Sequence, residues 1–222
     1  LHPVRMPKSA IRLRYTWAMG GLAAVLFGVE VLTGAMLMLY YRPVPEHAYG
    51  DIVDLAEQVP FGIVREVHRW GAHLMVIAVW LHMLRVFLTG SYKPPREFNW
   101  VIGVLLLVLT MFLSFTGYLL PWDQLALWAT TVGTNMAAAV PLLGHEGPSS
   151  ASLGWFDAGN DVRFLLLGGR SVGAHALLRF YVLHCVLVPL AMAALLAVHF
   201  WRIRRDGGMS GPADAAGPDL PS

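Results

Sequence analysis

Residues 68–97 read HRWGAHLMVIAVWLHMLRVFLTGSYKPPRE. The first two thirds of this stretch are mostly apolar, and a histidine lies near each end of that apolar segment. His68 and His82 are 14 positions apart. In a helix with about 100° and 1.5 Å per residue, this interval spans about 21 Å and leaves both side chains within about 40° of one face. Because about 20 apolar residues cross a bilayer, the stretch predicts a membrane helix with one histidine toward each leaflet.

A second apolar stretch repeats this arrangement. Residues 179–200, RFYVLHCVLVPLAMAALLAVHF, carry His184 and His199, which are 15 positions apart. The interval spans about 22 Å, with a residual rotation of about 60°. An even number of crossings makes the two stretches run the same way, so His68 is level with His184 near the outer face and His82 with His199 near the inner face. Each pair is predicted to hold one haem iron axially.

The alternative for any one of these residues is an isolated polar group facing the interior of a helix bundle. Four histidines at matching depths favour ligands over that alternative. His73 lies about 140° from His68 around the helix, so we expect a structural or interface role for it. The remaining histidines lie in predicted loops without a paired spacing: His2, His47, His145 and His175.

Composition places the chain in a membrane. Of its 222 residues, 56% are hydrophobic and 14% charged, with a mean hydropathy of +0.56. The single cysteine, Cys185, excludes an intrachain disulfide, a CxxC pair and a CxxCH haem attachment site. The sequence predicts an all-α integral membrane four-helix bundle, with short surface helices in the third loop, 121–176. The predicted spans are 16–40, 66–89, 100–120 and 177–203.

The predicted spans divide the chain into three regions: an amphipathic N-terminus at 1–15, the bundle at 16–205, and a flexible tail at 206–222 that has few apolar side chains. Most of the Lys and Arg residues that flank the spans fall on the side holding both termini, which predicts that side to be cytoplasmic. A bacterial inner membrane is expected, with a thylakoid-type membrane as the alternative. No basic patch interleaved with aromatic residues indicates nucleic acid binding.

Glycines repeat the histidine period in the two spans without paired histidines. Gly20 and Gly34, like Gly103 and Gly117, are 14 positions apart. A flat macrocycle lying against a helix needs a missing side chain, so we expect Gly20 and Gly103 at the inner haem and Gly34 and Gly117 at the outer one. Close helix packing is the alternative for either pair alone.

Arginines near the histidines are predicted to neutralise haem propionates, with interfacial snorkelling as the alternative for each. The predicted residues are Arg65, Arg69 and Arg179 at the outer site, and Arg12, Arg85 and Arg204 at the inner site.

Together with GYLLPWDQLALW at residues 117–128, these stretches resemble the N-terminal half of cytochrome b over about residues 15–211. The resemblance is closest to the cytochrome b6 of quinol-oxidising cytochrome bf-type complexes. It implies the split form, in which a second membrane subunit carries the remaining helices. It also implies two non-covalent b haems with quinol and quinone as substrates.

By this resemblance the chain is a subunit of a quinol:cytochrome c or plastocyanin oxidoreductase that works with a Rieske iron–sulfur protein and a c-type cytochrome in a dimeric, proton-translocating complex. The outer haem would take an electron from quinol and the inner haem would pass it to quinone. Moving a charge inward costs about 2.3 kcal/mol per 100 mV, so the inner haem is expected to have the higher potential. The border of the quinol site is carried over to Pro121, Trp122, Asp123 and Gln124.

Two positions depart from the bf-type pattern. Relatives tether an extra haem through a cysteine near the start of the first span, where residues 17–21 here read WAMGG, so a covalent extra haem is not expected. Glu30 replaces a neutral amide within the first span. Because a buried carboxylate is expensive, we hypothesise that Glu30 tunes the outer haem or handles a proton. The loop at 140–173 is predicted only to contact another subunit.

Two rival functions stay open. One is a di-haem membrane anchor of another quinone-linked oxidoreductase, against which PWDQ and the paired glycines argue. The other is a haem-free transporter or scaffold. Its usual signs, broken helices and inverted repeats, are not found in the sequence.

Overall fold

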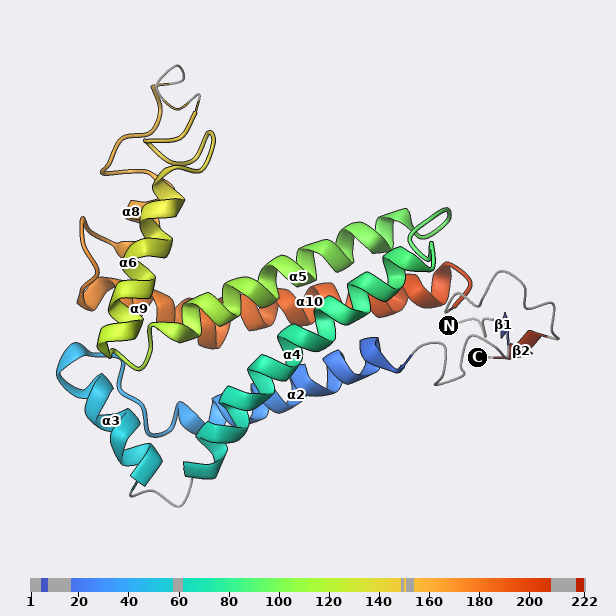
Figure 1. Ribbon diagram of the computed structural model, residues 1–222, viewed down its shortest axis with the longest axis horizontal. Coiled ribbons are helices and arrows are strands. Elements are labelled where there is room, and N and C mark those ends of the chain that lie inside the picture. The colour runs from blue at the N-terminus through green and yellow to red at the C-terminus, as the bar shows by residue number, and fades with distance from the viewer. Residues whose placement is uncertain are drawn as a thin grey trace. The chain divides into compact units, whose positions relative to one another are not determined.

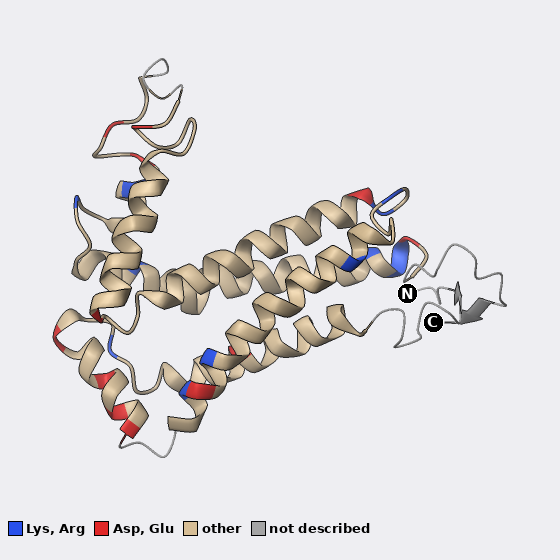
Figure 2. Ribbon diagram, in the orientation of Figure 1, with Lys and Arg blue, Asp and Glu red and all other residues tan. Residues whose placement is uncertain are grey.

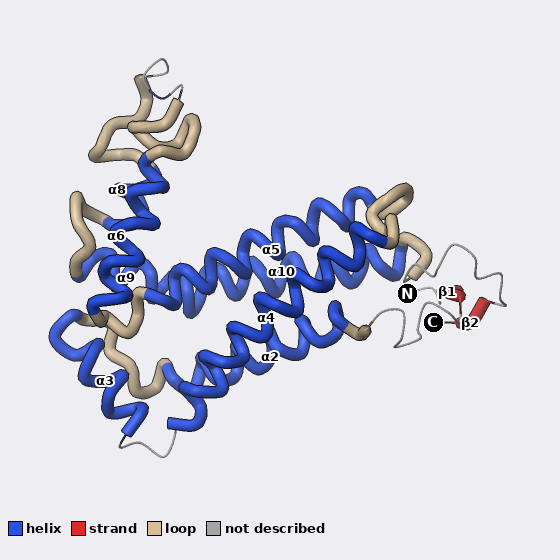
Figure 3. Tube along the Cα trace, in the orientation of Figure 1, coloured by secondary structure: helices blue, strands red, loops and turns tan. Residues whose placement is uncertain are grey.

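The computed structural model describes residues 5–7, 17–57, 62–148, 150, 154–208 and 219–221. It confirms the all-α membrane fold (Figure 1, Figure 3). Among the described residues, four helical segments are long and apolar enough to cross a membrane. Three are single helices, and the fourth is a continuous run of α9, η2 and α10. Their bounds are α2 Met19–Leu37, α4 Gly62–Leu88, α5 Glu97–Tyr118, α9 Ala174–Val182, η2 Leu183–Leu187 and α10 Val188–Arg205.

Short helices occupy two of the connections. Helix α3 (Pro45–Glu57) follows the first span, while α6 (Gln124–Ala138) and α8 (Val162–Leu167) lie in the third loop, as predicted. Two strands that the sequence did not predict, β1 (Arg5–Pro7) and β2 (Asp219–Pro221), pair in antiparallel register.

The spans expose their large apolar side chains. In α4, Leu74, Ile77, Trp80 and Leu84 are each more than half exposed. Between 0% and 22% of the residues in the apolar window of each span are buried inside the chain. Apolar surface on this scale requires an apolar solvent. The protein is therefore an integral membrane protein.

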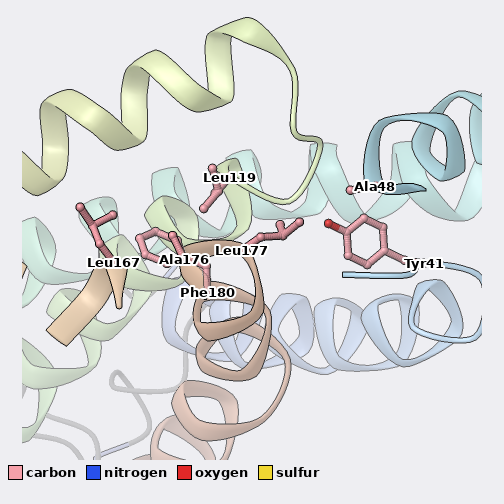
Figure 4. Packing of buried hydrophobic residues seen from close by; sticks show 7 residues of the cluster. All are labelled: Tyr41, Ala48, Leu119, Leu167, Ala176, Leu177 and Phe180. Carbon is pink, nitrogen blue, oxygen red and sulfur yellow. The ribbon is translucent and has the colours of Figure 1, made fainter. Parts of the chain in front are cut away.

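The chain forms two compact units. The first contains residues up to Leu32, His68–Met111 and the chain from Leu190, and the second contains Thr33–Val67 and Phe112–Pro189. The second unit has a buried apolar cluster (Figure 4). Its buried members are Tyr41, Ala48, Leu119, Leu167, Ala176, Leu177 and Phe180. The cluster joins α3, α8 and α9 to the end of α5, and the hydroxyl of Tyr41 donates to the Leu120 carbonyl at 2.6 Å.

Helix α3 is anchored by a buried acid. Pro45 begins the helix, at a position where a backbone N–H would have no partner within the helix, so the N–H that proline lacks costs no hydrogen bond. Acidic residues follow along the helix (Figure 2). Asp51 is 5% exposed and accepts hydrogen bonds from the Arg42 backbone N at 2.8 Å, Nε at 3.1 Å and Nη2 at 2.5 Å. The hydrogen bonds from Arg42 hold the pKa of Asp51 below its usual range. Arg42 therefore ties the end of the first span to α3.

Asp51→Asn should lower the thermal unfolding temperature at pH 7 by a few degrees, because it removes the charge that Arg42 partners. Since the carboxyl pKa is depressed in the folded state, its stabilisation is present above the unfolded pKa and is lost as pH falls through the folded pKa. The difference in unfolding temperature between Asp51→Asn and the unmodified protein should thus become smaller toward acid pH. Thermal melts of purified protein in detergent across this pH range test the prediction, and a gap that is constant with pH would contradict it.

Candidate functional site: the histidine positions

The structure brings His82 and His199 together in the first unit. His82 lies on α4 and His199 on α10, with ring centroids 6.5 Å apart and ring planes at 82°. An imidazole nitrogen binds a first-row metal at about 2 Å, and the ring centre lies about 1 Å further, so two axial rings across one metal have centroids roughly 6–6.5 Å apart. The observed separation therefore fits one iron between the two rings.

Glycines lie against these rings. A Cβ added at Gly20 would lie 3.0 Å from Cε1 of His82, and one at Gly103 would lie 3.9 Å from Cε1 of His199 and 3.5 Å from Sδ of Met83. The spacing predicted room for a macrocycle, whereas the nearest neighbour of Gly20 in the structure is the imidazole itself. The missing side chain therefore lets α2 approach a histidine ring closely.

A pocket in the first unit adjoins His199. Arg85, Arg96, Asn99 and Gly103 line it together with His199. Arg85 and Gly103 were predicted at the inner site, but Arg96 and Asn99 were not. Both fall between the predicted second and third spans, in a stretch whose charges were used only to predict topology. The pocket offers two guanidinium groups to an anion, such as a carboxylate, next to the histidine pair.

Of the other predicted inner arginines, Arg204 does not line this pocket. Arg204 is exposed near the end of α10, and Arg12 lies outside the described residues. Their neighbour Arg202 is mostly buried, pairs with Asp206 at 3.0 Å and lies over the Phe98 ring at 5.0 Å. Residues 206–208 form the turn that ends α10, and residues 209–218 of the predicted tail lie outside the described residues.

His184 is oriented within the second unit. Its Nδ1 lies 3.1 Å from the Leu113 carbonyl oxygen and 3.3 Å from the Thr116 hydroxyl. A Cβ at Gly117 would lie 2.6 Å from Cε1 of His184, closer than real Cβ atoms come. An Nδ1–H donated to a carbonyl leaves Nε2 with the lone pair, which is how metal-binding histidines are commonly held.

His68 meets the acid within the first span. Its Nδ1 lies 3.0 Å from Oε2 of Glu30, and both residues belong to the first unit. His184 belongs to the other unit, so the pairing of His68 with His184 stays a prediction. Gly34 accepts a backbone hydrogen bond from Met38 at 3.0 Å near the end of α2, and its role at the outer haem also stays a prediction.

The predicted outer arginines have protein partners. Arg65 donates to Glu66 at 2.9 Å, and the guanidinium of Arg69 lies 4.8 Å from the ring centre of Trp70. Arg179 donates to a backbone carbonyl in α8. Propionate binding by these arginines stays a prediction.

A π-helical turn surrounds His184. In η2 the N–H of Val188 bonds to the carbonyl of Leu183, five residues back. Pro189 follows and has no N–H to continue the α-helical pattern. A π-turn accommodates one extra residue, so the 15-residue interval from His184 to His199 turns about as far as 14 residues of α-helix. The interval thereby matches that between His68 and His82.

The Pro121–Gln124 segment enters α6 through a strained turn. Trp122 has φ of +55°, a conformation that bulky residues rarely adopt. Asp123 is the N-cap of α6, and its side chain accepts a hydrogen bond from the Ala126 N–H at 2.7 Å. Strained residues cluster at functional sites, which favours the predicted role of this segment without assigning it.

A buried acid also organises the loop at 140–173. Asp161 is 1% exposed, caps α8 through Phe164 N–H at 2.8 Å and lies 2.5 Å from Nδ1 of His145. Burial raises the pKa of Asp161, but the hydrogen bonds from His145 and Phe164 outweigh it and lower that pKa. The other unpaired histidines are exposed where described (His47, His73 and His175), and His2 lies outside the described residues.

The fold and the paired histidines are typical of a membrane-embedded haem protein. The sequence model of the family described as "Cytochrome b/b6/petB" matches residues 5–207. The chain therefore belongs to the cytochrome b family, and membership implies haem b. The residues of the inner pair fit this group by the separation of their rings.

Individual relatives agree with the family. The chain is 41% identical to the cytochrome b6 of Heliobacterium mobile over 207 residues, which are 93% of this chain and 88% of that protein. It is 43% identical to the menaquinol:cytochrome c reductase cytochrome b subunit of Geobacillus thermodenitrificans, over 89% of this chain and 82% of that one. It also resembles a chain of a solved "Hyperthermophilic respiratory Complex III", with 30% identity and a TM-score of 0.78, over 94% of this chain and 51% of that one.

Alanine substitutions at the glycines should have graded effects. Gly117→Ala should destabilise the protein by about 1–3 kcal/mol and lower its haem content, because the added methyl overlaps the His184 ring. Gly20→Ala should have a smaller effect. Gly21→Ala is the matched control, since nothing lies within 4 Å of a Cβ there. Haem content per chain and thermal melts measure the series. Equal effects of Gly20→Ala and Gly21→Ala would contradict the close approach of Gly20 to the His82 ring.

Deletion of one residue tests the π-turn. Removal of Val186 should convert η2 to α-helix and leave His184 and His199 in register, so both haems should be retained. Removal of Ala193, in regular α-helix beyond Pro189, should rotate His199 by about 100° and lose the inner haem. Pyridine haemochrome assays count the haems. The π-turn has no register role if both deletions give the same haem content.

Proposed function

We propose that the chain is the di-haem cytochrome b subunit of a quinol:cytochrome c, or plastocyanin, oxidoreductase. The observation that carries the proposal is the pair of His82 and His199, whose ring centroids are 6.5 Å apart, a separation that suits one axially ligated iron. Membership of the cytochrome b family supports it. It is preferred over a di-haem anchor of another oxidoreductase because the matching relatives are cytochrome b6 and cytochrome b subunits.

In this proposal four histidines ligate two irons. His82 and His199 hold the inner haem, and His68 and His184 hold the outer one. Two imidazoles leave no open coordination position, which suits electron transfer rather than oxygen chemistry. Arg85, with Arg96 beside it, offers charge-assisted hydrogen bonds to the propionates of the inner haem.

Bound haem would supply the one-electron carriers that link the two membrane faces. The chain's own residues set where those carriers lie, because the 14-residue interval in α4 places its two ligands about 21 Å apart in depth. Quinol oxidation is proposed beside Pro121–Gln124 at the outer face, with quinone reduction at the inner face. Basic residues near the C-terminal ends of α4 and α10 (Figure 2) support the assignment of those ends, and of both termini, to the cytoplasmic side.

The proposed complex contains further chains. A second membrane subunit would carry the remaining cytochrome b helices, and a Rieske iron–sulfur protein and a c-type cytochrome would take the other electron from quinol. This chain spans about half the length of the matched complex III chain. The name of the Geobacillus relative favours menaquinol as the quinol. The chain is proposed to be inactive alone, in a dimeric complex of a bacterial cytoplasmic membrane.

Haem counting tests the proposal. The purified complex should contain two b haems per copy of this chain in pyridine haemochrome assays, and a dithionite-minus-ascorbate spectrum should show a low-potential b haem. His184→Ala should retain one haem, because it removes one ligand of the outer iron only. His73→Ala is the matched control, since His73 is exposed and lies against Trp70 in α4. This control should retain both haems.

Three outcomes would contradict the assignment. A folded complex without b haem would exclude electron transfer through this chain. One haem per chain before substitution would exclude the two-pair arrangement. Loss of both haems from a folded His184→Ala protein would show that the two sites are not separate.

A further inference from the structure

The acid within the first span contacts a predicted iron ligand. Oε2 of Glu30 lies 3.0 Å from Nδ1 of His68, and the side chains are 13% and 23% exposed. Both residues lie in the same compact unit, on α2 and α4. A carboxylate beside Nδ1 accepts its proton in a hydrogen bond, so Nε2 carries the lone pair that an iron requires.

A glycine provides the space for this carboxylate. A Cβ added at Gly71 would lie 2.1 Å from Oε1 of Glu30, far inside contact distance. Gly71 is buried on α4, close to one turn beyond His68. The glycine therefore permits the carboxyl group to lie against the helix backbone beside the ligand.

We propose that Glu30 is a positioning residue for the outer haem, which fixes the tautomer and orientation of His68 and lowers the reduction potential of that haem. The inference rests on the proposed function, because it assumes that His68 ligates iron. A carboxylate hydrogen-bonded to a ligand imidazole raises the basicity of the ligand. A more basic ligand and a nearby negative charge both favour ferric over ferrous iron, so the one-electron reduction becomes harder.

In the described part of the chain, the contact with a carboxylate sets His68 apart from the inner pair, His82 and His199. Nδ1 of His184 has neutral acceptors, the Leu113 carbonyl oxygen and the Thr116 hydroxyl. No ion pair joins a carboxylate to His82 or His199 among the residues that the structure describes. The carboxylate therefore acts on the outer haem selectively and widens the difference in potential between the two haems. The electrical work of moving charge inward predicts a lower outer potential for a separate reason.

Substitution of Glu30 separates charge from hydrogen bonding. Glu30→Gln keeps an oxygen acceptor for His68 but removes the charge, and Glu30→Ala removes both. Redox titration of the purified complex, followed at the b-haem absorption bands, reports both haems at once. In Glu30→Gln, the ratio of reduced to oxidised outer haem at the original midpoint should rise about tenfold, which for one electron is about 59 mV. The inner haem is the internal control and should not shift.

Gly71→Ala tests the contact without changing any charge. The added methyl should displace the carboxylate, so the outer potential should rise as in Glu30→Gln. In a Glu30→Ala background the same methyl has no carboxylate to displace, so Gly71→Ala should add little further shift. Low-temperature EPR should show altered g-values for the outer ferric haem only, a sign of changed ligand geometry that a purely structural role of Glu30 would not produce.

Haem content distinguishes the outcomes. Two haems with an unchanged outer potential in Glu30→Gln and in Glu30→Ala would overturn this inference and leave the proposed function intact. Equal shifts at both haems would overturn it as well. Absence of b haem from the unmodified complex would overturn the proposed function itself. If Glu30→Ala does not assemble, Glu30→Gln and Gly71→Ala still decide the question.

Discussion

The constraint on which the structure depends is the depth of its histidines: an apolar helix that carries two of them must place one toward each face of the membrane. A helix rises about 1.5 Å per residue, so an interval of 14 residues fixes a separation of about 21 Å on nearly one face. α4 meets this requirement with regular geometry. The fourth span has one residue too many and meets it with a π-turn at His184. Glycines at the same period let α2 and α5 approach the rings, as Gly20 and Gly117 do.

The sequence predicted the parts of this arrangement that follow from period and composition. The four spans lie where predicted, with ends shifted by a few residues, and His82 meets His199. The π-turn was not predicted, although Pro189 within a span and an interval of 15 residues together were a usable signal, since a missing N–H frees the carbonyls of the preceding turn. The positions of the glycines were predicted, but their neighbours were not: a macrocycle was expected, and the structure places imidazole rings there. The period of the glycines alone does not say which group lies opposite a missing side chain.

Partners of acidic residues were the least predictable feature. No partner was predicted for Asp51 or Asp161, and Asp123 was predicted only at the border of the quinol site. In the structure Asp51 accepts three hydrogen bonds from Arg42, Asp123 caps α6, and Asp161 caps α8 while bonding His145. Each partnership joins residues whose proximity is set by the local fold. A capping role can be read from the position before a helix, but the ion pair of Asp51 and the contact of Asp161 with His145 depend on loop paths that no sequence period encodes.

At Glu30, the sequence identifies an unusual residue and the structure identifies its partner. Its position within an apolar span identifies it as unusual, since an isolated carboxylate in hydrocarbon is strongly unfavourable. The structure shows how the fold offsets that penalty, with a donor at Nδ1 of His68 and a backbone surface cleared at Gly71. In the proposed assignment, the contact that makes the acid tolerable also fixes which nitrogen of His68 is available to iron. Stabilisation of the buried acid and orientation of the ligand are thus one interaction, so a change at Glu30, Gly71 or His68 alters both.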